Sequence, residues 1–371
     1  MKVLHINSYY GNRFFYKNLF EKQLGNGFKI DVFVPVPTSL SLPKLDLGEY
    51  TSLNVTHKKY DRLFFHLKHR KIWNVLKTKY HFDEYDVIHA HSLFSNGYMA
   101  MKLKRVYKTP YVVVVRRSDV NTFFKYMLHL RKLGIQILSE ADQIIFLSKP
   151  YREHVFEKYI PMNLKEKLYK KTLIIPNGIN DFWLDSNEKE GRERAPSISC
   201  LKILYVGQIR KNKNILATVE AIRILQEKGY EVSYTIAGEI YETDYFSQIS
   251  EIPFIDYLPP QDKEALKEIY KSNDIFVMPS ISEAFGIVYA EAMSQGLPVV
   301  YTKNQGFDGQ FENGEVGYAV DCFNPQEIAV RIEDIVKSYS QLSRNCLLNA
   351  DAFNWDKINQ NIQDVYLACM Q

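Results

Sequence analysis

The sequence predicts an α/β protein built from two doubly wound domains. Short runs rich in β-branched residues alternate with segments of helical spacing, which is typical of βαβ units and a parallel sheet. The alternation stops once, in a charged stretch, and then starts again. A length of 371 residues also favours more than one domain. We therefore expect two Rossmann-like domains that face each other across an interdomain cleft.

The first series of strands lies within residues 1–180. Its apolar runs are VLHI, IDVFVPV, YDVIHAH, PYVVVV and QIIFLS. Between them, residues 16–23 and 95–104 have the spacing of amphipathic helices. This half of the chain therefore predicts an N-terminal Rossmann-like domain.

A charged stretch separates the first series from the second. Residues 181–200 contain Gly and Pro and few apolar side chains, which is typical of an interdomain linker. The runs KILYVGQI, YTIAGEI, DIFVMPS, PVVYTK and GYAV follow it. Helical spacing occurs between them, at residues 215–227, 263–271, 287–295 and 326–338. We expect a second Rossmann-like domain over residues 201–350.

Composition excludes several classes of protein. The hydrophobic share of 46% and the charged share of 24% are ordinary for a globular protein. The first residues lack the pattern of a secretory signal, and no apolar run approaches the roughly 20 residues that span a bilayer. The four cysteines form no C-x-x-C pair, so we expect reduced packing residues and a cytoplasmic protein.

Charge is divided unevenly along the chain. Residues 1–180 hold 30 Lys and Arg against 14 Asp and Glu, and residues 181–371 hold 17 against 29. The halves are therefore +16 and −12, which indicates two units with different partners.

The most informative stretch is PSISEAFGIVYAEAMSQGLPVV, residues 279–300. It predicts a strand end, a polar loop and a helix that begins near Gly286. The free amides of Gly286, Ile287 and Val288, together with the helix dipole, suit a diphosphate. Glu283 and Glu291 lie on either side of these amides, eight positions apart, where both could accept hydrogen bonds from ligand hydroxyls.

This stretch resembles the signature of the retaining nucleotide-sugar glycosyltransferases of family 4, also called group 1, whose fold is GT-B. The resemblance extends to members that act in bacterial polysaccharide biosynthesis. In that family the first Glu contacts the donor sugar and the second holds the ribose. The resemblance therefore implies these roles for Glu283 and Glu291, and it implies that the final helix, within residues 351–371, returns to the first domain.

Further segments resemble the donor site of the family. In YVGQIRKNKN, Lys213 takes the position that neutralises the donor phosphates, and Gln208 stands where the family usually has Arg. Either Arg210 or Lys211 can replace that charge. The remaining donor-binding positions implied by the resemblance are Gly207, Gly238, Tyr257, Leu258, Phe285 and the residues 286–288 named above.

The N-terminal half resembles the family more loosely. Gly11 stands alone where family members often have two glycines, and His91 ends a strand on the acceptor side. In VVVVRRSDV, Arg116 replaces the usual His of the reacting centre, and Asp119 follows. Either Arg116 takes over an electrostatic role or Asp119 positions the reacting groups. Gly11, His91 and Asp119 are therefore the candidate acceptor-side residues, and Arg116 and Asp119 join Glu283 as candidate catalytic residues.

The implied reaction is transfer of a hexose-type sugar, with retention, from a UDP- or GDP-linked donor. The acceptor is expected to be a glycan or a polyprenyl-diphosphate-linked sugar, and no nucleic acid is expected as a partner. The sequence has no Asp-x-Asp to hold a metal on the diphosphate, so we expect no metal and no cofactor. A nucleotide-sugar 2-epimerase and a non-catalytic carbohydrate-binding subunit remain alternatives. A nicotinamide dehydrogenase is disfavoured because no G-x-G-x-x-G follows a predicted strand.

Residues 57–80 predict a contact with an anionic membrane. They hold eight Lys and Arg and one acidic residue, interleaved with Leu63, Phe64, Phe65, Ile72, Trp73 and Leu76. This mixture is typical of an interfacial helix, and it fits equally a core-packed helix with a solvated basic face. The interfacial interpretation would place the protein on the inner face of the cell membrane.

Overall fold

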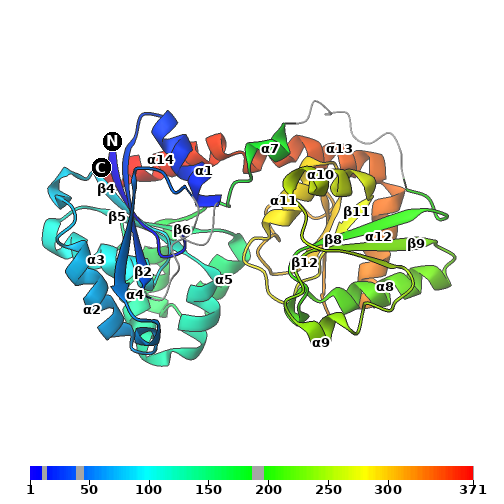
Figure 1. Ribbon diagram of the computed structural model, residues 1–371, viewed down its shortest axis with the longest axis horizontal. Helices are drawn as coiled ribbons and strands as arrows, with labels where there is room; N and C mark the ends of the chain where they lie inside the picture. Colours follow the sequence, from blue (N-terminus) through cyan, green and yellow to red (C-terminus); the bar gives the residue numbers. More distant parts are fainter. Residues whose placement is uncertain (11–14, 39–45, 186–195, 371) are drawn as a thin grey trace. The chain divides into compact units, whose positions relative to one another are not determined.

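The computed structural model divides the chain into two compact units (Figure 1). It describes residues 1–10, 15–38, 46–185 and 196–370. The N-terminal unit holds residues 1–147, 152–176 and 355–371, and the C-terminal unit holds residues 148–151 and 177–354. The predicted cleft between the units stays a prediction, and each unit is described by itself.

The N-terminal unit is built on a seven-stranded parallel sheet with the order β3-β2-β1-β4-β5-β6-β7. Its strands are β1 (Lys2–Ile6), β2 (Lys29–Pro37), β3 (Thr51–His57), β4 (Val87–Ala90), β5 (Tyr111–Val115), β6 (Gln143–Phe146) and β7 (Thr172–Ile174). All residues of β4 and β5 are buried, because helices cover both faces of a parallel sheet.

The helices of this unit include the last helix of the chain. They are α1 (Phe15–Gly25), α2 (Phe65–Leu76), α3 (Ser95–Tyr107), α4 (Arg131–Glu140), α5 (Lys149–Lys158), α6 (Met162–Tyr169) and α14 (Trp355–Met370). Shorter helical segments are η2 (Lys59–Leu63), η3 (Phe82–Glu84), the π-helical η4 (Asp119–Phe124) and η5 (Leu128–Leu130). The red α14 lies beside the dark-blue α1 in Figure 1 and also contacts β4, β5 and β6.

The C-terminal unit contains a six-stranded parallel sheet with the order β10-β9-β8-β11-β12-β13. Its strands are β8 (Leu201–Val206), β9 (Val232–Ala237), β10 (Ile255–Leu258), β11 (Ile275–Val277), β12 (Val299–Thr302) and β13 (Gly317–Val320). Its helices are α7 (Asp181–Leu184), α8 (Ile215–Glu227), α9 (Thr243–Phe246), α10 (Lys263–Ser272), α11 (Ile287–Ser294), α12 (Pro325–Lys337) and α13 (Tyr339–Asn349), with η6 (Lys211–Lys213) and η7 (Ala350–Phe353).

Each sheet has one point at which the strand order reverses direction. In the N-terminal unit the chain passes from β1 outward to β3 and then returns beside β1 as β4. In the C-terminal unit it passes from β8 outward to β10 and returns beside β8 as β11. Doubly wound sheets bind ligands at such points, outside the carboxyl ends of the strands.

The predicted α/β class and both parallel sheets are confirmed, and each predicted apolar run contains a strand. Three strands were missed: β3, β7 and β10. Each lies at the edge of its sheet, where partial exposure removes the continuous apolar run that marks an interior strand. In the part of the chain that the structure describes, no helix has both the length and the apolar character needed to cross a bilayer.

Candidate functional site

The candidate donor site of the C-terminal unit lies in the loops that follow β8 and β11. These strands are neighbours, and they flank the point where the strand order reverses. Lys213 belongs to the first loop, and Glu283 and Gly286 belong to the second. The topology therefore brings two segments about seventy residues apart to the same edge of the sheet.

Lys213 and Glu283 form an ion pair, with Nζ 2.5 Å from Oε2. Their side chains are only 16% and 14% exposed, so water screens this pair less than it screens a surface pair. The other carboxylate oxygen of Glu283 accepts the amide N–H of Ala284 at 3.0 Å. The structure thus joins the two residues that the sequence assigned to the diphosphate and to the sugar.

Asparagine side chains fasten the two loops together. Asn212 donates its side-chain amide to the Ser282 carbonyl at 3.3 Å, and its main-chain carbonyl accepts the Ile281 amide at 2.9 Å. Asn214, which has a left-handed backbone, donates to the carbonyls of Pro279 and Cys322. Neither residue could be identified from the sequence, because a bond from a side chain to a distant carbonyl leaves no periodic signal.

Helix α11 begins at Gly286 without a side-chain cap. Gly286 has φ of +77°, and a Cβ at this position would lie 2.6 Å from the Tyr289 ring. Only glycine accepts both the left-handed backbone and the close ring. The first amides of the helix, at Gly286, Ile287 and Val288, have no side-chain cap to accept them, which leaves a positive dipole end suited to an anion.

Glu291 lies on the second turn of α11 and is partly exposed. The Tyr270 hydroxyl of α10 donates to its Oε2 at 3.3 Å. Burial raises the pKa of Glu291 to about 7, and the bond from Tyr270 opposes that rise. The carboxylate therefore changes charge near neutral pH.

Two glycines allow the loops after β8 and β9 to approach each other. A Cβ on Gly238 would lie 2.0 Å from the Gly207 carbonyl oxygen, which no side chain can accommodate. The side chains beside them turn toward the loop after β9. Gln208 donates to Glu239 at 3.1 Å, and the Nε of Arg210 lies 3.8 Å from Glu242. Arg210 is thus paired within this loop rather than with the Lys213–Glu283 pair.

The remaining predicted donor residues contribute mainly to packing or main-chain bonds. The Phe285 ring is buried against Phe353, with centroids 5.4 Å apart. The Tyr257 hydroxyl donates to the Gly238 carbonyl at 3.1 Å. The Leu258 carbonyl accepts the Gly238 amide at 3.0 Å. Their predicted contacts with the donor stay predictions.

In the N-terminal unit, Asp119 ties together the loops that follow β4 and β5. Its buried carboxylate accepts the amide N–H groups of Leu93, Phe94 and Arg116 at 2.8–3.1 Å. Burial raises the pKa of Asp119 to about 6, against the lowering effect of these three bonds. This geometry favours the positioning role over direct contact with a substrate.

Arg116 is partly exposed at the same sheet edge. Its Nε donates to the His91 carbonyl at 3.3 Å, and its guanidinium lies 5.5 Å from the centre of the Tyr16 ring. The cation is therefore held by the loops after β4 and β5 and by α1. Gly11, the third predicted acceptor-side residue, lies outside the described residues.

His91 belongs to a buried histidine cluster that the sequence analysis missed. Its Nε2 lies 3.0 Å from His5 Nδ1, and the other His5 nitrogen lies 2.8 Å from the Gln23 side-chain oxygen. His89 Nδ1 lies 2.6 Å from the Tyr366 hydroxyl. One ring nitrogen from each histidine lies within 4.8 Å of the others, a spacing that could hold a metal ion. Its bonds already connect β1, β4, α1 and α14, so we interpret the set as a hydrogen-bonded network.

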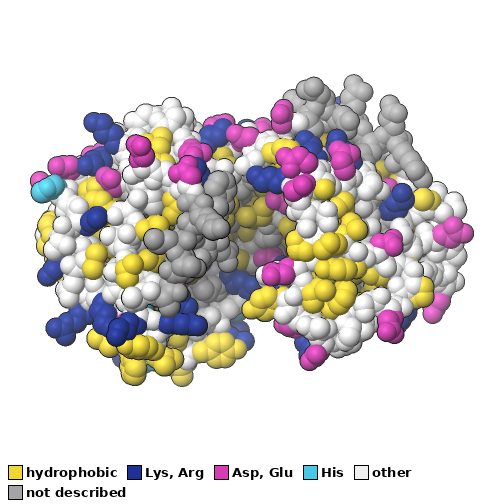
Figure 2. All heavy atoms as spheres, viewed as in Figure 1, with side chains coloured by type: hydrophobic (Ala, Val, Ile, Leu, Met, Phe, Trp, Pro, Cys, Tyr) yellow, Lys and Arg dark blue, Asp and Glu magenta, His cyan; other side chains and the backbone are white. Residues whose placement is uncertain are grey.

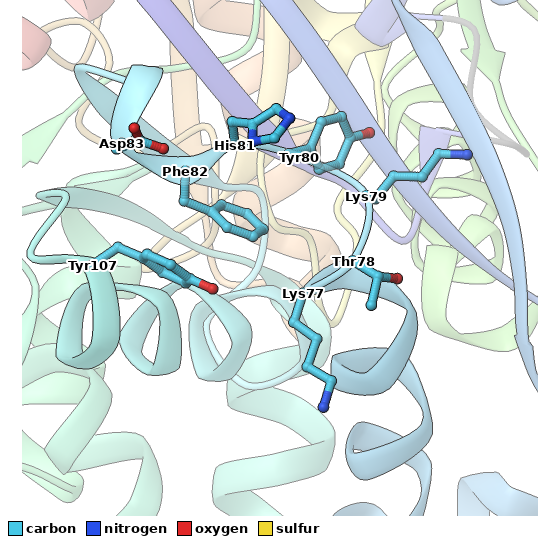
Figure 3. Close-up of a pocket in the computed structure, with 8 residues that line it drawn as sticks. All are labelled: Lys77, Thr78, Lys79, Tyr80, His81, Phe82, Asp83 and Tyr107. Atoms are coloured by element: carbon cyan, nitrogen blue, oxygen red, sulfur yellow. The ribbon is translucent and has the colours of Figure 1, made fainter.

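A pocket of about 330 Å³ lies at the opposite edge of the N-terminal sheet (Figure 3). Residues 77–83 and Tyr107 line it, and these segments precede β4 and β5. It therefore lies at the amino ends of the strands. None of the predicted site residues contributes to it.

Two family models match the chain, and together they cover most of it. The model of the glycosyltransferases of family 4 matches residues 15–181, and the model of the glycosyl transferases of group 1 matches residues 195–351. The chain belongs to the group 1 glycosyltransferases. Family and fold together support a transferase.

Relatives of this glycosyltransferase include an uncharacterized glycosyltransferase of Methanocaldococcus jannaschii. The two are 26% identical over 96% of this chain and 93% of the relative. The capsular polysaccharide biosynthesis glycosyltransferase CapM of Staphylococcus aureus is 30% identical over 62% of this chain and 61% of its own length.

Solved structures share the fold of this glycosyltransferase. Sucrose-phosphate synthase from Thermosynechococcus elongatus superposes with a TM-score of 0.75 over 99% of this chain and 98% of its own, at 18% identity. HepE from Anabaena, solved in complex with UDP-glucose, superposes with a TM-score of 0.68 over 98% of both chains, at 16% identity. The protein therefore has the GT-B fold.

Proposed function

We propose that this glycosyltransferase moves a hexose-type sugar, with retention, from a UDP- or GDP-linked donor to a glycan or polyprenyl-diphosphate-linked acceptor. The reaction would serve cell-surface polysaccharide synthesis at the inner face of the membrane. The observation that carries the proposal is the Lys213–Glu283 ion pair beside the amino end of α11. UDP-glucose in the HepE structure and the capsular role in the name of CapM support the donor and acceptor classes.

The ion pair suggests how the donor is received. A diphosphate near the first amides of α11 would draw Lys213 away from Glu283, because it carries more negative charge than one carboxylate. Glu283 would then be free to accept a hydrogen bond from a sugar hydroxyl. Binding would convert one internal pair into two contacts with the donor.

The leaving group needs stabilisation as negative charge grows on it. Once the donor is bound, Lys213 and the α11 amides would already contact the diphosphate, so they would stabilise this charge without further reorganisation. The sequence offers no Asp-x-Asp for a metal, so we propose transfer that is independent of added metal. Glu291 would hold the ribose, and Arg116, held in place through Asp119, would supply positive charge on the acceptor side.

The test is turnover with a panel of nucleotide sugars, first selected by their ability to raise the melting temperature. Release of nucleoside diphosphate with a new glycosidic bond of unchanged anomeric configuration supports the proposal. Release of a 2-epimer of the donor sugar would favour the epimerase alternative. Donor binding without any turnover, across acceptors of both classes, would favour a non-catalytic subunit. Loss of turnover in EDTA, restored by Mg²⁺, would contradict metal independence.

A further inference from the structure

The structure divides the segment 57–80 differently from the sequence prediction. Phe65, Ile72 and Leu76 face the core of the N-terminal unit and are buried. Trp73 lies under the Lys102 ammonium, whose Nζ is 4.3 Å from the ring centre. The apolar face of α2 is therefore already occupied, so this face cannot enter a membrane.

The exposed apolar residues lie just before α2. Leu63 is 82% exposed and Phe64 is 62% exposed, and Tyr60 and Leu67 are exposed beside them. A second exposed group follows η4, where Tyr126 is 69% and Leu128 is 62% exposed. We name these six residues, with the cations around them, the basic apolar surface.

The two groups are neighbours in space. The Phe65 ring, next to Phe64, packs edge-on against Phe123 with centroids 6.1 Å apart, and Phe123 is three residues from Tyr126. In Figure 2, hydrophobic side chains gather at the lower end of the N-terminal unit beside a row of Lys and Arg, below α2 and α4 of Figure 1. Large apolar side chains exposed together in this way indicate a binding surface.

The charge of this surface has one sign. Its exposed cations are Lys58, Lys59, Arg62, Arg70, Lys125 and Lys132. The segments 58–70 and 120–132 contain one acidic residue, Asp61, which is buried and bonded to Lys71 at 2.7 Å. No carboxylate of these segments therefore opposes an anionic partner.

Lys68 supports the same conclusion. It is partly buried, and among the described residues no ion pair is formed with it. Desolvation and the nearby Arg62 lower the pKa of Lys68 to about 8. An anionic group placed beside this cation would restore the charge that burial disfavours.

The position of the surface is related to the candidate acceptor side. η2 follows the carboxyl end of β3, and η4 follows the carboxyl end of β5. All strands of this sheet are parallel, so both segments lie at the edge that also carries Arg116 and the loop after β4. A lipid-linked acceptor held by its lipid would approach this edge.

We propose that the basic apolar surface docks on an anionic lipid bilayer, with Leu63, Phe64, Tyr126 and Leu128 entering the interface and the surrounding cations contacting lipid phosphates. This inference rests on the proposed function only for the lipid-linked acceptor. The occupant is a bilayer because bulky apolar side chains and same-sign charge on one surface match an acyl boundary beneath anionic headgroups.

The test is flotation with vesicles of phosphatidylcholine alone and of phosphatidylcholine with phosphatidylglycerol. The wild-type protein should bind the anionic vesicles at low salt and release as salt rises. Leu63→Ser with Phe64→Ser should lower the partition coefficient at least about tenfold, since two exposed side chains no longer insert. Lys59→Glu with Arg62→Glu should lower it by a similar factor.

Matched controls lie at the other edge of the sheet. Val106→Ser removes an equally exposed apolar residue, and Lys77→Glu with Lys79→Glu reverses two cations within the same segment 57–80. Both controls should bind anionic vesicles as the wild type does. Unchanged binding by the Leu63 and Phe64 variant, or equal loss in the controls, overturns the proposal.

Two further results separate this inference from the proposed function. Wild-type protein that does not bind either vesicle, while nucleotide still raises its melting temperature, overturns the docking surface and the membrane location but leaves the proposed sugar transfer intact. Wild-type protein that binds anionic vesicles, but whose melting temperature no nucleotide raises, supports the docking surface and contradicts the proposed function. A dimer that the Leu63 and Phe64 variant dissociates, with no vesicle binding, would show that a second copy of the chain covers this surface.

Discussion

In the absence of ligand, the charges of Lys213 and Glu283 neutralise each other. Removing either side chain therefore affects the empty protein as well as the complex. Deleting one partner leaves the other partly buried and unpaired, so each variant loses a donor contact and also changes the empty protein. Binding measurements are therefore more informative than activity alone, because they separate donor affinity from turnover.

Lys213→Ala should weaken binding of the nucleoside diphosphate by about tenfold to a hundredfold, because one charge-assisted contact of roughly 1.5 to 3 kcal/mol is lost. Isothermal titration calorimetry measures it. Lys228→Ala removes an exposed lysine just after α8, away from the loops after β8 and β11, and should leave affinity unchanged. Equal affinity of the Lys213 variant and the wild type would show that this lysine does not contact the phosphates.

Glu291 should make nucleotide binding depend on pH. Its pKa of about 7 means that the carboxylate is protonated below neutral pH, so a charge-assisted bond to the ribose strengthens as pH rises from 6 to 8. Calorimetry across this range should show a slope of affinity with pH that Glu291→Gln abolishes. In the protein without ligand, ionisation of Glu291 has the opposite effect, because it lowers stability instead of strengthening a bond. The raised pKa lowers stability as pH rises from 4.5 through about 7, and the loss is complete above that, so Glu291→Gln should melt a few degrees higher than the wild type at pH 8. A flat binding profile for the wild type would contradict the ribose assignment.

Asp119→Ala should destabilise the N-terminal unit by about 3 to 5 kcal/mol, because three backbone amides lose their acceptor in a buried loop. Urea unfolding measures it, with Asp83→Ala as the exposed control. If the Asp119 variant instead unfolds like the wild type and loses only turnover, the carboxylate acts on the substrate and not through the loops.

The residues of the donor site could be named from the sequence because the two glutamates, the glycine and the lysine lie in recognisable local patterns. The structure adds that Lys213 and Glu283 contact each other, which needs the loops after β8 and β11 to be neighbours. The role of Asp119 could not be predicted in this way. Its three partners are main-chain amides, and every residue type except proline has one.

At the scale of elements, the start of α11 depends on Gly286. Gly286→Ala should destabilise the C-terminal unit by about 2 to 4 kcal/mol, since the left-handed backbone costs roughly 1 to 2 kcal/mol and the Tyr289 ring must also move. Gly229→Ala is the matched control. It has φ of +91° with nothing within 4 Å of the added Cβ, so it carries the backbone cost alone. The melting temperatures of both variants measure the two costs. An equal drop in melting temperature for Gly286→Ala and Gly229→Ala would show that the contact with the ring does not destabilise the protein.

Hydrophobic periodicity predicted the interior strands and the long helices. It did not predict which apolar residues of the segment 57–80 are buried and which are exposed. Its apolar residues have two destinations: Ile72 and Leu76 enter the core, and Leu63 and Phe64 lie in solvent before the helix begins. Both groups consist of bulky apolar side chains, so their residue types do not distinguish them. Only the boundary between η2 and α2 separates them. Single-sequence patterns place such boundaries poorly, because short 3-10 turns are common at the ends of α-helices and helix ends fray.

At the scale of the whole molecule, the buried histidine cluster should make the protein sensitive to acid. Burial lowers the pKa of His5 to about 3 and the pKa values of His89 and His91 well below 6.5. The unfolded chain therefore binds protons below pH 6.5 that the folded chain does not. The free energy of unfolding should therefore decrease as pH is lowered below 6.5, by up to roughly 1.4 kcal/mol per pH unit for each ring.

Urea unfolding of the wild type at pH 7, 6 and 5 checks this expectation. His5→Gln should reduce the slope by about one proton, and His81→Gln, at an exposed position, should leave it unchanged. Identical pH slopes for the wild type and the His5 variant would show that folding does not change the pKa of this ring.

The position of α14 has a consequence for how the chain is made on the ribosome. Its buried residues Ile358, Ile362 and Tyr366 complete the core of the N-terminal unit, yet they are translated only after the whole C-terminal unit. The C-terminal unit needs nothing beyond residue 354. While the chain grows, the surface of β4, β5 and β6 that α14 will cover stays open to water and to chaperones. Of the two units, the one whose synthesis begins earlier is therefore completed later.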